Sequence, residues 1–104
     1  MNYTLTLQDV EDYLDSKQPD EVIGITCHSE KCLVSEAFIA KYPEVISASI
    51  GGGYATIGLR DDSALKTIKL STDMQILYHR FDGLNKGEIE RPVTRREWEV
   101  SHDH

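Results

Sequence analysis

The sequence has no apolar run long enough to cross a bilayer, and it contains only two cysteines. A membrane-spanning helix needs about 20 consecutive apolar residues, so we expect no membrane partner. The first residues also lack the basic region and apolar stretch of a secretory signal, and we therefore expect a cytoplasmic protein. Two cysteines are too few for a secreted disulfide framework, so both are expected to be thiols.

Basic residues are scarce. The chain has 11 Lys and Arg residues against 18 Asp and Glu residues, which gives a net charge of −7. Because binding to phosphate backbones depends on Lys and Arg displacing counterions, no nucleic-acid partner is expected. The excess of acid lies in residues 1–44, whose net charge is −6, whereas residues 45–104 are nearly neutral. An electrostatic partner should therefore meet the first half.

The chain also lacks long linkers, internal repeats and low-complexity segments. Its 104 residues, 39% hydrophobic and 28% charged, are typical of one domain that buries a modest core. The sequence therefore predicts a single domain over residues 1–104.

The first helix is predicted by its start signal and by its apolar period. Thr6 and Asp9 have the spacing of a capping box, in which each side chain bonds the other residue's amide. Apolar residues then recur at helical spacing, while the intervening residues are acidic. We expect a helix over residues 7–16 that ends before Pro19, because a residue preceding proline is disfavoured in a helix.

A second, central helix is predicted over residues 32–41. Residues 21–26 form a short apolar run before it, which we interpret as a buried loop or a brief strand. Ser29 is the expected cap of the helix, and Pro43 stops it. Because apolar residues occur around most of its circumference, this helix should be covered on several sides.

Past Pro43 the apolar period changes to two, which predicts strands. Residues 45–50 and 54–59 flank three glycines and should form a β-hairpin with Ile46, Ala48 and Ile50 on one face. Residues 65–70 supply a third strand. The result is a three-stranded antiparallel meander.

The last third contains two more helices. Thr72 to Gln75 resembles a capping box, and the apolar period that follows predicts a helix closed by Gly83. Thr94 and Glu97 repeat this pattern for a short helix that continues to about Val100. The expected fold is α+β: two helices, the meander, a helix and a short terminal helix, with the helices packed on one sheet face.

The reactive side chains crowd together between Cys27 and Cys32, with His28 beside them. If Ser29 caps the second helix, Cys32 lies in its first turn, where the helix dipole would stabilise a thiolate and lower the pKa. Cys27 could then act as a resolving thiol. The favoured interpretation is simpler: Cys32 is a small buried residue of an apolar helix.

The same residues could also bind zinc. Cys27, His28 and Cys32 would supply two sulfurs and a nitrogen, with His79, His102 or His104 as the fourth ligand. The spacing departs from the close cysteine pairs of zinc fingers, and no second pair exists. We therefore expect no metal or other cofactor.

The three glycines Gly51, Gly52 and Gly53 precede Tyr54. Phosphate-binding loops lead into a helix, whereas a strand pattern follows here, so a hairpin turn is the better interpretation. Three glycines exceed what a turn needs, which leaves room for a partner that approaches the backbone closely.

The first helix presents an acidic face made by Asp9, Glu11, Asp12 and Asp15. Such a face is usually just solvated. With the charge of the first half, it could instead recognise a basic protein or mimic the phosphates of a nucleic acid.

The segments 21–24, 32–38, 80–82 and 92–94 together resemble a layout found in small uncharacterised bacterial and bacteriophage proteins. That loose group has no assigned activity, so the resemblance implies none here and transfers no catalytic residue. It implies only a cytoplasmic accessory protein.

Two hypotheses follow. The first is a non-enzymatic domain that binds a protein partner through the acidic helix and the turn from Gly51 to Tyr54. The second is a thiol or metal site on Cys27, His28 and Cys32. A homodimer that hides part of the apolar second helix is a further possibility.

Overall fold

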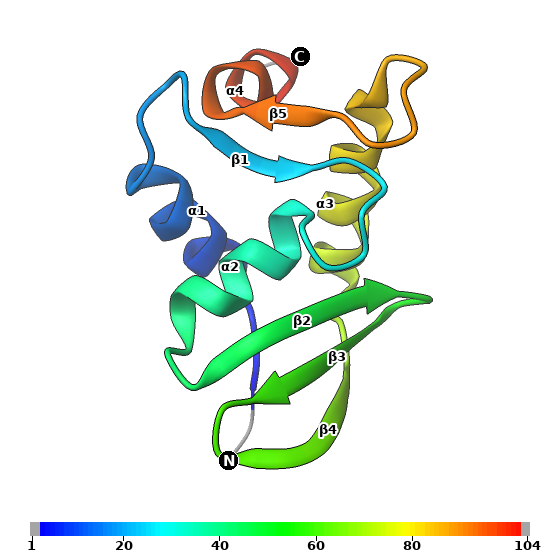
Figure 1. Cartoon of the computed structure of the whole chain (residues 1–104). Helices are drawn as coiled ribbons and strands as arrows, with labels where there is room; N and C mark the ends of the chain where they lie inside the picture. Colours follow the sequence, from blue (N-terminus) through cyan, green and yellow to red (C-terminus); the bar gives the residue numbers. More distant parts are fainter. Residues whose placement is uncertain (1–2, 103–104) are drawn as a thin grey trace.

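The computed structural model describes residues 3–102 and shows an α+β fold (Figure 1). In chain order its elements are α1 (Leu7–Asp15), β1 (Val22–Ile25), α2 (Leu33–Lys41), β2 (Val45–Gly51), β3 (Tyr54–Leu59), β4 (Asp62–Lys69), α3 (Thr72–Asp82), a 3₁₀ turn η1 (Gly83–Asn85), β5 (Pro92–Thr94) and α4 (Arg95–His102). None of the helices in residues 3–102 has the length and apolar character that a membrane crossing requires.

Helix α2 lies in the middle of the molecule (Figure 1). The sheet β2–β3–β4 lies on one side of it, and β1 with β5 lies on the other. Contacts with α1, β1, β2 and α3 bury Leu33, Val34, Ala37 and Phe38 of α2. This confirms the predicted central helix. It also removes the reason given for a dimer through α2, because these apolar side chains are already covered within one chain.

The predicted meander is confirmed, with β3 between β2 and β4 and antiparallel pairing throughout. Gly52 and Gly53 adopt φ values of 59° and 83° at the tip of the first hairpin, a conformation that favours glycine. The predicted face of β2 is wrong at its start. A bulge lies between Val45 and Ser47, so Val45 is buried and Ile46 is 55% exposed.

A second sheet pairs β1 with β5, antiparallel. Residues 21–26 therefore contain the brief strand that was one of the two interpretations. Strand β5 was not predicted, because it has three residues and begins with Pro92. The backbone amide of Thr26 donates to the Arg91 carbonyl at 2.9 Å and extends this pairing.

Two predicted helix caps are wrong. Residue Cys32 occupies the N-cap of α2, and the Ser29 carbonyl instead accepts from the Ile50 amide at 2.8 Å. Helix α3 is capped by Ser71, whose hydroxyl accepts from the Met74 amide at 3.2 Å. Ser71 directly precedes the predicted cap and has the same capping chemistry, so the sequence alone does not separate the two.

Candidate functional site

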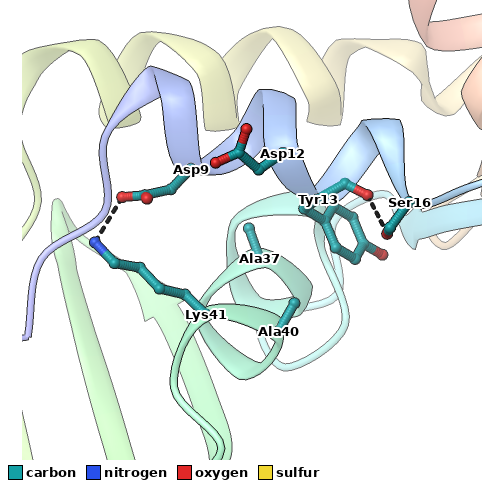
Figure 2. Close-up of a pocket in the computed structure, with 7 residues that line it drawn as sticks. All are labelled: Asp9, Asp12, Tyr13, Ser16, Ala37, Ala40 and Lys41. Atoms are coloured by element: carbon teal, nitrogen blue, oxygen red, sulfur yellow. Dashed lines mark hydrogen bonds and ion pairs between the residues drawn. The ribbon is translucent and has the colours of Figure 1, made fainter.

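A groove with a volume of about 240 Å³ lies between α1 and α2 (Figure 2). It is lined by Asp9, Asp12, Tyr13 and Ser16 of α1 and by Ala37, Ala40 and Lys41 of α2. Residues separated by three or four positions share one face of a helix, which explains why these residues meet. The two alanines project from α2 toward α1, where Asp9 and Asp12 line the other side of the groove (Figure 2). Ala37 is buried and Ala40 is exposed, so Ala40 is the apolar surface that the groove offers.

One end of the groove is closed by an ion pair (Figure 2). The Lys41 Nζ atom lies 2.6 Å from Asp9 Oδ2, and the Thr6 amide donates to the same oxygen at 2.8 Å. Burial raises the pKa of Asp9, but the bonds from Lys41 and Thr6 outweigh it and hold this pKa below its ordinary value. Asp9, predicted as an interaction residue, is thus used inside the fold.

Replacing Asp9 with alanine should lower the free energy of unfolding by about 1–2 kcal/mol at pH 7, because the capping box and the ion pair are both lost. The folded-state pKa of Asp9 is depressed, so this stability is present above the unfolded pKa and is lost as pH falls through the folded value. The difference in free energy of unfolding between wild type and Asp9→Ala should therefore become smaller below about pH 4. Urea unfolding at pH 7 and pH 3 measures it, with Glu11→Ala as control. An equal gap at both pH values would contradict the role of the carboxylate charge.

The remaining carboxylates of α1 form the acidic rim, which we define as Glu11, Asp12 and Asp15. All three residues are exposed. Within residues 3–102, the bond that the Asp12 carboxylate accepts is a local one from Gln8 Nε2 at 2.9 Å. The side chain of Asp15 is 69% exposed, although one of its oxygens lies 3.6 Å from an Arg95 nitrogen. The acidic rim therefore offers charge to solvent, whereas Asp9 does not.

Tyr13 lines the groove and also links α1 to β1. Its hydroxyl donates to the buried carbonyl of Ile23 at 2.9 Å, and burial, helped by the negative charge of Glu36, raises the tyrosine pKa. Lys17 Nζ lies 5.4 Å from the centre of the ring. Tyr13, Glu36 and the two alanines were not predicted as site residues. The sequence does contain one indication of the groove. Ala37, Ala40 and Lys41 are spaced three and four positions apart, so they share one face of the predicted second helix.

The turn from Gly51 to Tyr54 lies at the end of the β2–β3 hairpin, away from α1 (Figure 1). Gly52 and Gly53 are explained by their positive φ values, and the Gly53 carbonyl accepts from the Leu70 amide at 2.9 Å. A β-carbon at Gly51 would meet nothing within 4 Å. The structure therefore does not join this turn and the acidic rim into one surface.

Cys27 lies in a separate recess of about 260 Å³ at the end of α3, with His28, Ser29, Ile50, Tyr78 and Asp82. It is exposed, and its φ of 57° is uncommon for a residue other than glycine. Its amide donates to Asp82 Oδ1 at 2.8 Å, which holds this conformation. The Asn85 side-chain amide lies 3.8 Å from Sγ, as a donor to the sulfur.

Cys32 has a different environment. It is only 2% exposed, and burial raises its pKa although bonds with Ser35 partly oppose the shift. The expected thiolate at the start of α2 is therefore wrong, and the interpretation as a small buried residue fits. Both cysteines are free thiols.

The predicted zinc ligands do not gather in the described structure. His28 Nδ1 accepts from the Glu30 amide at 3.2 Å, within its own turn. His79 is exposed on α3. His104 and the side chain of His102 lie outside the described part. Among the residues described, no cluster of three or more His, Cys, Asp or Glu side chains could hold a metal ion.

Comparison with known proteins gives no relative for this chain. No family model, curated protein or solved structure matches it. The resemblance to small bacterial and bacteriophage proteins thus stays a prediction, and function is argued from the residues of the chain.

Proposed function

We propose that this chain is a non-enzymatic binding domain that holds a basic segment of a protein partner in the α1–α2 groove, and that it works in the cytoplasm as an accessory protein. The single observation that carries this proposal is a groove in which the exposed Ala40 of α2 lies across from Asp12 of α1. Glu11 and Asp15 extend the negative charge along the exposed side of α1.

A lysine or arginine side chain suits this arrangement. Its aliphatic stem can cover the exposed Ala40 side chain while its charged head remains at the carboxylates and in water. The Asp9–Lys41 pair makes the two ends of the groove different, because Lys41 repels a cation at its end. The partner should therefore enter with its basic side chain directed toward Asp12 and Asp15.

The affinity for a short basic peptide should be modest and sensitive to salt. Exposed ion pairs contribute roughly 0.2–1 kcal/mol each, and they weaken as ionic strength rises. At about 240 Å³ the groove is smaller than the pockets that usually enclose a small ligand, so we expect most of the binding energy to come from a segment that extends along α1 and α2.

The test uses fluorescence anisotropy with labelled lysine-rich and arginine-rich peptides at low and physiological salt. The Asp12→Asn/Asp15→Asn variant should bind about tenfold more weakly, because two exposed pairs of roughly 0.7 kcal/mol each are lost. The matched control is Glu88→Gln/Glu90→Gln, which changes the net charge equally on exposed residues of the segment before β5. The control should stay within about twofold of wild type.

The outcome separates position from total charge. If both double variants weaken binding equally, the peptides respond to the overall charge of −7 and the groove is not the site. If neither variant changes the affinity, the proposal is wrong. Circular dichroism of each variant confirms that the fold is kept.

A second candidate function is a thiol site at Cys27. The observation that favours it is an exposed sulfur, held at an uncommon backbone angle by Asp82 and facing the Asn85 amide. The sulfur accepts from the Asn85 amide and donates to the Asp82 carbonyl, and these two contacts orient it. Because Cys32 is buried with a raised pKa, this site does not include a resolving thiol. Its signature is alkylation of Cys27 that is faster than that of free cysteine and slows in Asn85→Ala.

A further inference from the structure

Helix α3 exposes an apolar residue at the centre of its outer face. Ile76 is 54% exposed, and Leu7 beside it at the start of α1 is 48% exposed. Between them lies a groove of about 170 Å³ that is also lined by Asp73, Leu77, Arg80 and Trp98. This surface shares no residue with the α1–α2 groove or the acidic rim.

The charges on this face are arranged symmetrically about Ile76 and Leu77. Asp73 lies one turn before this pair and Arg80 one turn after it, about 10 Å apart along the helix axis. In residues 3–102, neither the Asp73 carboxylate nor the Arg80 guanidinium forms an ion pair. The guanidinium lies 5.8 Å from the centre of the Trp98 ring, which holds it at the groove.

We infer that a second copy of this chain docks here, with the two α3 helices antiparallel about a twofold axis. The midpoint between positions 73 and 80 falls between Ile76 and Leu77. A twofold axis at that point places Asp73 of each copy opposite Arg80 of the other. It also brings the two Ile76 side chains together over the grooves floored by Trp98.

The pattern selects a second copy over other occupants. A basic peptide would be attracted by Asp73 but repelled by Arg80. An acidic peptide would be attracted by Arg80 but repelled by Asp73. The same surface in the opposite orientation satisfies both ends, as isologous interfaces require. The patch is small, so the dimer is weak and forms at high protein concentration.

The dimer leaves the proposed binding groove open. Asp12 and Tyr13 lie on the side of α1 that faces α2, whereas Leu7 lies on the side that faces α3. A dimer would therefore present two α1–α2 grooves, and a partner with two basic segments would bind more tightly than one with a single segment. The inference itself stands whether or not the groove binds a basic partner.

Sedimentation velocity over a concentration series tests the inference. Wild type should dimerise as its concentration rises toward about 1 mM. Asp73→Arg and Arg80→Asp should each weaken the dimer at least tenfold, because each variant brings like charges together at both ends. The double variant Asp73→Arg/Arg80→Asp should dimerise again. An equimolar mixture of the two single variants should form a heterodimer, since one carries cations at both ends and the other carries anions.

Each other outcome overturns the inference. Wild type that stays monomeric to about 1 mM contradicts it, as do single variants that dimerise like wild type. A folded double variant that remains monomeric also contradicts the proposed pairing. Should Arg80→Asp fail to fold because it no longer stacks on Trp98, Ile76→Asp decides the question. This change at an exposed position should keep the fold and abolish the dimer, and a dimer that persists would refute the contact.

Discussion

Replacing Gly24 with alanine is expected to destabilise the fold by about 3 kcal/mol or more. A β-carbon at this position in β1 would lie 2.7 Å from the Leu33 amide nitrogen and 3.0 Å from the Cys32 carbonyl carbon. Both atoms belong to backbone at the start of α2, so they cannot move aside as a side chain could. The ring of Phe81 closes the third side at 3.0 Å.

Urea unfolding followed by circular dichroism measures this effect, and Gly51→Ala provides the matched control. A β-carbon at Gly51 meets nothing within 4 Å, and Gly51 does not have a positive φ. The control should therefore change the free energy of unfolding by less than about 0.5 kcal/mol. Equal stability of the two variants would contradict the close approach of β1 and α2.

Iodoacetamide is expected to alkylate Cys27 of the folded chain thousands of times faster than Cys32. Cys32 is 2% exposed beneath the start of α2, so its sulfur reacts only when this region opens. Opening free energies in a core approach the global stability, and about 5 kcal/mol corresponds to a factor of several thousand. The raised pKa of Cys32 slows the reaction further, because the thiolate is the species that displaces iodide.

Mass spectrometry of tryptic peptides at timed intervals gives both rates in one sample. Cys27→Ser and Cys32→Ser confirm the assignments, and denaturant should equalise the rates in wild type. Similar rates in the folded chain would contradict the buried position of Cys32. A Cys27 that reacts no faster than free cysteine, with or without Asn85, would exclude the second candidate function and leave the first intact.

The parts of the fold that were predicted correctly depend on residues close in sequence. The capping box of Thr6 with Asp9 and that of Thr94 with Glu97 both form, because each joins residues three positions apart. The bulge at Val45 and the pairing of β5 depend instead on a partner strand. Nothing in the local period of residues 45–50 distinguishes Val45 from Ile46, so the inward face could not be predicted.

The same distinction applies to the candidate site. The acidic residues of α1 were identified from charge and helical spacing alone. The ion pair of Asp9 with Lys41 joins residues 32 positions apart and required the packing of α1 on α2. That contact divides the predicted acidic face, since it occupies Asp9 and leaves Glu11, Asp12 and Asp15 on the rim.

The most direct test of the proposed function is to locate a bound basic peptide on the chain. Amide chemical shifts in a ¹⁵N-labelled sample should be followed while an unlabelled lysine-rich peptide is added at low salt. We expect the largest shifts at Asp12, Ser16, Ala37 and Ala40, which line the α1–α2 groove, with little change around Cys27. Shifts spread evenly over acidic surfaces, or centred on another face, would contradict binding in the groove.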